Sequence, residues 1–269
     1  MTAKTASRAA RVGVIIFPGT NSEDETKRAC EAVGLETDLV HWKTPLEAVR
    51  KYDALVLPGG FAYEDRVRAG VIAAHDAVVE VVRENAALGK PVLGICNGAQ
   101  VLMEAGLVPG LDHARGPQAG FARNAPLGRY VSRHVYVKLN VPPTRCVFTT
   151  HLLQGAVIPA WASHGEGRLA ASAHVLERIV AGDHAAFVYS DADGNVTADA
   201  TPNGSAMGVA GLVNVEGNVL ALMPHPERDA WTFMHVDGPG REGAKGDTEA
   251  MLAPSGGIAL FAGLAAALS

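Results

Sequence analysis

The sequence predicts an α/β fold, in which a mostly parallel central sheet has helices on both faces and is extended by antiparallel strands. Two observations carry this prediction. Short apolar strands alternate with helices through the first half of the 269-residue chain, a pattern typical of a parallel sheet that is buried on both sides. The second half holds β-branched or alternating segments with little helix between them, which favours an antiparallel extension of the same sheet.

The first half supplies the expected parallel strands and the helices that cover them. The strands are Val12–Phe17, Leu35–His41, Ala54–Leu57 and the apolar run from Pro91 that leads to Cys96. The helices run from Asn21 or Ser22 to Val33, from Thr44-Pro45 to Tyr52, and from about Arg66 to Leu88. Asn, Ser and Thr are favoured helix caps, proline is favoured in the first turn, and Gly34 suits the end of the first helix.

Two of these strands end in segments that are candidates for a site. Pro58-Gly59-Gly60 stops the third strand, and Cys96 follows the fourth. Ligands of parallel sheets bind beyond the carboxyl ends of the strands. Both segments are therefore expected to line one crevice.

The second half is expected to add the antiparallel strands. The strand segments are Arg129–Asn140, Val147–Thr150, Gly155–Ala160 and Phe187–Ser190, with hairpin turns at Asp191–Asn195 and Glu216–Asn218. The stretch His235–Gly257 is rich in Gly and Pro and is interpreted as a surface loop, followed by a terminal helix at Ile258–Leu268. Residues 1–11 are interpreted as a polar N-terminal tail, and 12–269 as a single domain.

Composition excludes several classes of protein. Hydrophobic residues make up 48% of the chain, and the formal net charge of −5 gives no electrostatic reason to bind nucleic acid or an anionic membrane. The 3 cysteines are far apart and form no CxxC pair, so neither a disulfide framework nor a metal site is expected. No apolar run is long enough for a signal sequence or a membrane span, and we expect a soluble cytoplasmic protein.

Gly94-Ile95-Cys96-Asn97-Gly98 is the most informative segment of the sequence. It follows an apolar run and is typical of a strand that turns sharply into a helix, the nucleophile elbow. The flanking glycines leave room for Cys96 to project from a strained backbone, and the positive end of the following helix favours a thiolate. The alternative is a buried, inert cysteine, because free cysteines are among the most buried residues.

A matching base is expected after the strand Asn218–Met223, in Pro224-His225-Pro226-Glu227. A cysteine nucleophile needs a base, and the base needs an acceptor that fixes its tautomer. Alternate residues of an extended segment point the same way, so His225 and Glu227 can form this pair. Either residue alone would be interpreted as an ordinary surface or core residue. Together with Cys96 they predict a Cys-His-Glu triad.

These residues resemble a known family. Gly94–Gln100 and His225–Glu227 are similar to the motifs of the class I (triad) glutamine amidotransferases, whose fold is flavodoxin-like. Four further segments are similar to the glutaminase subunits of phosphoribosylformylglycinamidine synthases, namely Pro58–Tyr63, Ser163–Gly167, Asn203–Ser205 and Met223–Arg228. The resemblance extends from about Val12 to Arg228.

The resemblance implies a catalytic role for each matching residue. Cys96 would attack the side-chain amide of L-glutamine and form a glutamyl thioester. His225 would take the thiol proton, give it to the departing ammonia and then activate water, while Glu227 would orient the imidazole. The oxyanion would lie between the N–H groups of Asn97 and of the Gly60-Phe61 turn.

Substrate contacts are implied at two further places. Gln100 lies one helical turn after Cys96 and would hold the glutamine backbone. The turn formed by His164, Gly165 and Glu166 would bind the substrate α-carboxylate or face the synthetase. The alternatives are that Gln100 caps a helix and that Gly165 only builds a turn.

Cofactors and partners are also implied by the resemblance. The chain has no GxxxxGK[ST] loop, and no cofactor is expected in it. ATP, Mg²⁺ and formylglycinamide ribonucleotide would bind a separate synthetase subunit, a small third subunit would bridge the two, and ammonia would pass through a tunnel.

Three other functions share parts of this pattern. A glutaminase of guanylate or pyridoxal phosphate synthesis would share the triad but not the segment Ser163–Gly167. A cysteine deglycase or peptidase of related fold often has His after the nucleophile, where this chain has Asn97. A catalytically silent regulatory subunit would normally lack part of the triad, and here all of it is present.

Overall fold

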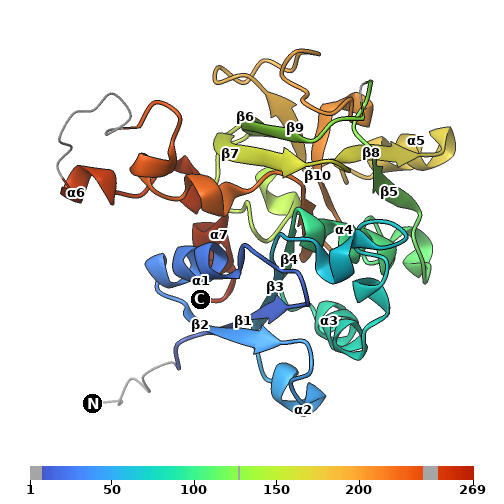
Figure 1. The fold of residues 1–269 in the computed structure, drawn as a ribbon, viewed down its shortest axis with the longest axis vertical. Coiled ribbons are helices and arrows are strands. Elements are labelled where there is room, and N and C mark those ends of the chain that lie inside the picture. The colour runs from blue at the N-terminus through green and yellow to red at the C-terminus, as the bar shows by residue number, and fades with distance from the viewer. Residues whose placement is uncertain (1–7, 127, 239–247) are drawn as a thin grey trace.

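A nine-stranded sheet forms the centre of the computed structural model, which describes residues 8–126, 128–238 and 248–269. Across the sheet the strands follow the order β2-β1-β3-β4-β11-β10-β9-β6-β7 (Figure 1). Their bounds are β1 Arg11–Ile16, β2 Glu36–His41, β3 Ala54–Leu57, β4 Val92–Ile95, β6 Val131–Leu139, β7 Val157–His164, β9 Phe187–Ser190, β10 Val209–Val213 and β11 Val219–Leu222.

The sheet has a parallel half and an antiparallel half, as predicted. Strands β2, β1, β3, β4 and β11 pair in parallel. Strands β10, β9, β6 and β7 each pair antiparallel with the preceding strand in the sheet order. A second, two-stranded antiparallel sheet consists of β5 (Ala119–Ala122) and β8 (Arg168–Ala171).

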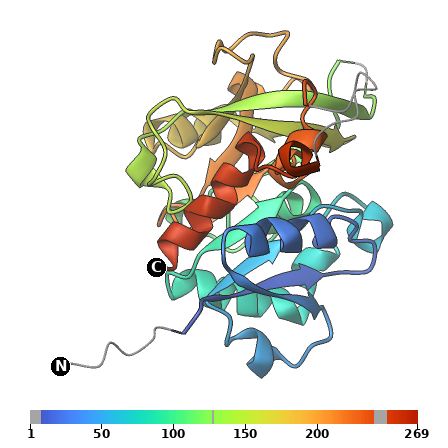
Figure 2. The same ribbon diagram turned by 90° about the vertical axis from the view of Figure 1, so that its left-hand side faces the viewer.

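Helices cover both faces of the parallel half. Helices α1 and α7 lie on one face and α3 and α4 on the other (Figures 1 and 2). The helix bounds are α1 Glu23–Ala32, α2 Leu46–Val49, α3 Ala77–Ala87, α4 Asn97–Glu104, α5 Ala173–Ala181, α6 Thr248–Met251 and α7 Ala259–Ala267. Among the described residues, no helix is both long and apolar enough to cross a lipid bilayer.

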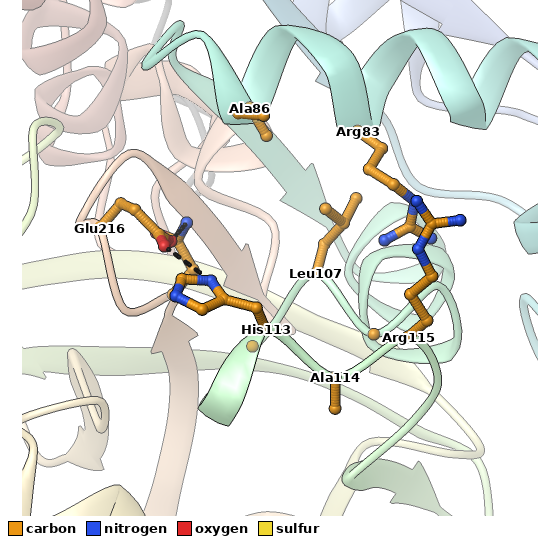
Figure 3. A pocket seen from close by; sticks show the side chains of 11 residues that line it. Arg83, Ala86, Leu107, His113, Ala114, Arg115 and Glu216 are labelled. Atoms are coloured by element: carbon orange, nitrogen blue, oxygen red, sulfur yellow. Dashed lines mark hydrogen bonds and ion pairs between the residues drawn. The ribbon is translucent and has the colours of Figure 1, made fainter.

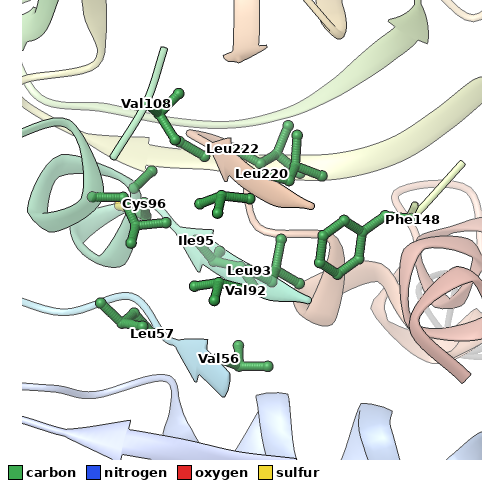
Figure 4. Close-up of a cluster of buried hydrophobic side chains, with 14 of the residues drawn as sticks. Val56, Leu57, Val92, Leu93, Ile95, Cys96, Val108, Phe148, Leu220 and Leu222 are labelled. Carbon is green, nitrogen blue, oxygen red and sulfur yellow. The ribbon is translucent and has the colours of Figure 1, made fainter. Parts of the chain in front are cut away.

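The hydrophobic core explains why the central strands read as continuous apolar runs. Every residue of β3, β4 and β11 is buried, as expected of parallel strands with helices on both sides. Figure 4 shows their side chains packed around the turn that carries Cys96. The nucleophile candidate is therefore attached to the buried centre of the fold.

The close contacts of α4 with strands β3 and β4 depend on two glycines. A Cβ atom at Gly98 would lie 1.9 Å from the carbonyl oxygen of Leu57, and one at Gly94 would lie 2.6 Å from Leu102 Cδ1. Both glycines therefore allow helix and strand to approach more closely than any side chain permits. This close approach brings Cys96 to the carboxyl edge of the sheet, as the elbow pattern predicted.

One predicted helix is much shorter than expected. The helix expected from Arg66 to Leu88 begins only at Ala77. Gly70, with φ +80°, lies against the backbone of α4, where a Cβ atom would come within 2.7 Å of Val101 N. Asp76 accepts a hydrogen bond from the hydroxyl of Tyr63 at 2.6 Å. These contacts hold residues 63–72 as an irregular loop across α4.

In the second half, one predicted strand is absent and one helix was not expected. Val147–Thr150 forms a turn rather than a strand, because Phe148 is buried beneath α7 and a Cβ at Gly263 would lie 1.9 Å from its carbonyl. Helix α5 was not expected. It begins after Ser172, whose hydroxyl accepts a hydrogen bond from Val175 N.

The terminal predictions fall partly outside the described residues. Residues 1–7 of the expected polar tail and 239–247 of the expected loop His235–Gly257 are not described. Arg8 forms an ion pair with Asp53 at 2.8 Å, and Arg11 already belongs to β1.

Gly98→Ala is expected to lower the free energy of unfolding by about 1–3 kcal/mol or more. The added methyl group would collide with a backbone carbonyl that cannot rotate away, although alanine is the better helix former by about 1 kcal/mol. Urea unfolding measures the change. Gly120→Ala is the control, because no atom lies within 4 Å of its Cβ position. Equal stability of the two variants would contradict the close packing of α4 on β3.

Candidate active site

Cys96 lies at the turn between β4 and α4. Its backbone has φ 50° and ψ −107°, a conformation that side chains rarely adopt and that is typical of functional turns. The residue is 5% exposed, and its sulfur lies 3.7 Å from the carbonyl oxygen of Ser163. The first N–H groups of α4 point away from the helix beside the sulfur, because they have no intrahelical acceptor.

The other two cysteines have a different environment. Cys30 and Cys146 are fully buried, and burial raises the pKa of each thiol to about 12. Both are therefore protonated and unreactive at neutral pH. Cys96 is the cysteine that lines a cavity.

His225 and Glu227 form the predicted pair. His225 Nδ1 lies 2.5 Å from Glu227 Oε1, and both side chains are buried. The backbone of His225 is fixed by two hydrogen bonds with Trp161 in β7, of 2.8 and 3.1 Å. The carboxylate thus fixes the tautomer of the ring, so that Nε2 is available for a second partner.

The second partner of His225 is Cys96. Burial lowers the pKa of His225, but the charges of Glu227 and Cys96, together with hydrogen bonds to both, outweigh burial and raise it to about 9. These neighbours therefore favour the cationic form of the imidazole. A buried imidazolium between a sulfur and a carboxylate can hold the sulfur as a thiolate, the reactive form of cysteine.

Two of the backbone N–H groups expected to form an oxyanion hole are free to donate, and the third is not. The backbone N–H groups of Gly60 and Asn97 donate to no other group of the described residues, and both residues flank Cys96. The N–H of Phe61 is not available, because it donates to the carbonyl of Gly19 at 2.8 Å. Phe61 instead contributes its side chain, which is 45% exposed and lines the cavity.

Two adjoining cavities meet at Cys96. One, of about 170 Å³, reaches from Cys96 past His225 to Arg228. The other, of about 190 Å³, is lined by Cys96, Gln100 and the turn of residues 163–166. Both are also lined by Gly60, Phe61, Tyr130 and Ser163. A small molecule can therefore lie against the sulfur with room on either side.

The three expected substrate residues all line the second cavity, each in a different way. Gln100 Nε2 donates to the carbonyl of Glu166 at 2.7 Å, and its Oε1 accepts from Asn97 Nδ2 at 2.9 Å. Gly165 accepts a hydrogen bond from the N–H of Asn124. His164 is 3% exposed, and neither ring nitrogen has a hydrogen-bond partner. Gln100 thus ties the turn to α4.

The segment Asn203–Ser205 supports this turn from behind. Asn203 Nδ2 donates to the carbonyl of Gly167 at 2.7 Å, and Asn124 bonds to both His164 and Gly167. A Cβ at Gly167 would lie 2.3 Å from the imidazole of His164, so glycine is required there. The motif marks a structural support rather than a contact with substrate.

Two carboxylates line the second cavity, of which Asp65 was not expected and Glu166 was expected only as part of the turn with His164 and Gly165. Asp65 and Glu166 both line it, and burial together with the charge of Glu166 raises the pKa of Asp65 to about 6. Asp65 also accepts a hydrogen bond from Asn97 Nδ2 at 3.0 Å. Asp65 follows the segment Pro58–Tyr63, and Glu166 lies in Ser163–Gly167. In a sequence, each carboxylate is interpreted as an ordinary solvated charge, because only the folded loops bring the two side chains to one cavity.

Another cavity, of about 340 Å³, lies away from the triad between α3, the segment after α4 and the hairpin before β11 (Figure 3). Arg83, Arg115, His113 and Glu216 line it, and His113 pairs with Glu216 at 3.4 Å. It contains none of the predicted site residues. Although it is larger than either cavity at Cys96, it offers no nucleophile.

Glu227→Gln is expected to lower the pKa of His225 from about 9 toward or below the usual value of roughly 6.5, because the carboxylate charge that offsets burial is lost. NMR titration of the labelled histidine ring measures the shift. Glu36→Gln on the exposed side of β2 is the control and leaves the pKa unchanged. An unchanged pKa in Glu227→Gln would mean that the carboxylate does not act on the ring.

His164 is expected to make folding sensitive to acid. Burial and the nearby His225 lower its pKa to about 4, so between roughly pH 6.5 and 4 the unfolded chain binds a proton at this residue that the folded chain does not. Stability is therefore lost as the pH falls through this range, by up to about 3 kcal/mol.

Urea unfolding at about pH 7 and pH 4.5 tests this linkage. His164→Asn should lose less stability between the two pH values than the wild type, whereas the exposed His151→Asn should behave as the wild type does. The same loss in all three proteins would contradict a neutral, buried His164.

Comparisons with known proteins agree with this geometry. Residues 9–255 match the model of the CobB/CobQ-like glutamine amidotransferase domain. The phosphoribosylformylglycinamidine synthase subunit PurQ of Methanothrix thermoacetophila is 39% identical over 86% of this chain and 94% of that protein. The PurQ subunit of Symbiobacterium thermophilum is 44% identical over 81% of this chain and 87% of that protein.

Solved structures give the same result. A chain in the structure of PurLQS from Thermotoga maritima has a TM-score of 0.68 and 28% identity, covering 84% of this chain and 92% of that one. The glutaminase domain of Trypanosoma brucei CTPS with bound acivicin has a TM-score of 0.56 at 16% identity, covering 96% of this chain and 94% of that one, and shares the fold. The chain therefore belongs to the CobB/CobQ-like glutamine amidotransferases, among the PurQ subunits of phosphoribosylformylglycinamidine synthase.

Proposed function

We propose that this chain is the glutaminase subunit of phosphoribosylformylglycinamidine synthase and that Cys96, His225 and Glu227 are its catalytic triad. The observation that carries the proposal is the buried ring of His225, which is hydrogen-bonded to Glu227 and lines one cavity together with Cys96. Family membership supports the reaction, and this geometry supports the roles of the residues.

In the first half-reaction, the Cys96 thiolate attacks the amide carbon of glutamine. The developing oxyanion lies against the N–H groups of Gly60 and Asn97, and removing such a donor costs roughly 3 kcal/mol in comparable hydrolases. His225 donates its proton to the amide nitrogen as the C–N bond breaks. Ammonia leaves, and a glutamyl thioester remains on Cys96.

In the second half-reaction, His225 is neutral and acts as a base. It removes a proton from a water molecule that attacks the thioester carbon, and glutamate and the thiolate are formed. Glu227 stabilises the imidazolium that results. The chain's own residues supply all proton transfers of this cycle.

The second cavity suits the amino acid end of the substrate. Asp65 and Glu166 place carboxylates near its wall, which complement an α-ammonium group. Gln100, His164 and Gly165 shape the same wall. Gln100 acts chiefly through the hydrogen bonds by which it holds the turn of residues 163–166 and Asn97.

The partner of this chain is a synthetase subunit that consumes the ammonia. The relatives named PurQ and the PurLQS structure support this partner. ATP and Mg²⁺ would bind the synthetase, which converts formylglycinamide ribonucleotide to formylglycinamidine ribonucleotide, and a small third subunit would bridge the two. A cytoplasmic location stays a prediction.

Cys96→Ala is expected to abolish product formation from glutamine while leaving product formation from ammonium salts, because only the thiolate is lost. The assay uses the chain with its synthetase and bridging subunits and measures ammonia release and product together. Cys30→Ala is the matched control, since this cysteine is buried away from the site.

Three outcomes distinguish the possible functions. Glutamine-dependent activity in Cys96→Ala would overturn the triad. Glutamine hydrolysis that supports a different synthetase would keep the glutaminase and overturn the purine assignment. A wild-type chain that supports product formation from ammonium alone would be a silent regulatory subunit.

A further inference from the structure

A second cluster of side chains with metal-binding capacity lies outside the triad. His134 in β6, Asp229 and His235 bring their ligand atoms within 4.8 Å of one another. Asp229 ends the short helix η6 (Pro226–Asp229), which also contains Glu227. His235 follows the short helix η7 (Thr232–Met234). No pattern in the sequence indicated this cluster, because its members come from distant segments.

The geometry of the cluster is compact and largely shielded from solvent. His134 Nε2 lies 2.7 Å from Asp229 Oδ2, and His235 Nδ1 lies 3.1 Å from the same oxygen. The side chain of Asp229 is fully buried, that of His134 is 8% exposed and that of His235 is 24% exposed. Ser255 Oγ donates to the other oxygen of Asp229 at 2.7 Å.

We propose that His134, Asp229 and His235 bind a divalent transition-metal ion of the zinc class. Two imidazoles and one carboxylate form a recognised three-ligand set for such ions, with the fourth position left to water. Zinc bonds of 2.0–2.1 Å separate tetrahedral ligand atoms by about 3.3 Å, so small side-chain movements suffice. Imidazole ligands disfavour the hard cations Ca²⁺ and Mg²⁺.

The surroundings of the cluster support a built site. The hydroxyl of Ser255 orients the carboxylate in the way that outer hydrogen bonds orient metal ligands. The ring of His134 packs edge-on against Trp161 and Tyr136, which fixes the direction of its nitrogen. The greater exposure of His235 provides a path by which an ion can enter.

A bound ion would join three parts of the chain. It would connect β6 of the antiparallel half, the segment that carries Glu227, and the region before the C-terminal helix. The ion would act as a structural link between these segments, since none of its ligands lines either cavity at Cys96.

Metal binding is tested on the full chain, freed of any affinity tag and carrying Cys96→Ser, because a thiolate beside an imidazole can itself bind zinc. Elemental analysis after equilibration with Zn²⁺ gives the stoichiometry, and the visible absorption of Co²⁺ reports tetrahedral nitrogen and oxygen ligands. We expect one equivalent per chain and a higher melting temperature with Zn²⁺ than with a chelator.

Variants assign the ion to this cluster. His134→Gln and His235→Gln should each lose the bound equivalent and the thermal shift, and Ser255→Ala should weaken affinity by roughly 10–100-fold. His113→Gln, whose side chain is 79% exposed elsewhere on the surface, should bind as the parent does. If the parent holds no stoichiometric ion, the cluster is a hydrogen-bonded network only. The same conclusion follows if the His134 and His235 variants bind the ion as tightly as the parent does.

Discussion

The left-handed backbone at Cys96 is the constraint on which the site depends. A φ of 50° at a non-glycine residue costs free energy, and it persists because α4 is pressed against β3 at Gly98 and β4 is buried between its neighbours. The same packing places the first N–H groups of α4 beside the sulfur. The proposed nucleophile and the proposed oxyanion donor Asn97 therefore belong to one turn, and their positions are coupled.

The remaining parts of the site are held by hydrogen bonds rather than by apolar packing. Gln100, Asn124 and Asn203 use side-chain amides to fix the turn of residues 163–167 from three directions. A buried amide that satisfies backbone groups rigidifies a loop, and it is costly to replace. Of these three residues, Gln100 lines the second cavity, whereas Asn124 and Asn203 hold its wall from outside the cavity.

The sequence predicted the parallel half well because each buried strand there is a short apolar run with a glycine or proline at its end. Strand Ala54–Leu57 and the turn at Cys96 were found in this way. The loop of residues 63–72 could not be predicted, because its conformation depends on the contact of Gly70 with α4, which is distant in sequence. Asp65 and the engagement of the Phe61 N–H with Gly19 were missed for the same reason, since neither has a local signal.

The hydrogen bonds between Trp161 and His225 connect two distant parts of the sheet. Trp161 belongs to β7, the edge strand, and His225 follows β11, which lies in the interior of the sheet. This bridge brings β7 at the edge of the sheet next to the segment that follows β11. The backbone of His225, the proposed base, is thus fixed by the outermost strand of the sheet. Any displacement of β7 would therefore act on the backbone of His225 through these two hydrogen bonds.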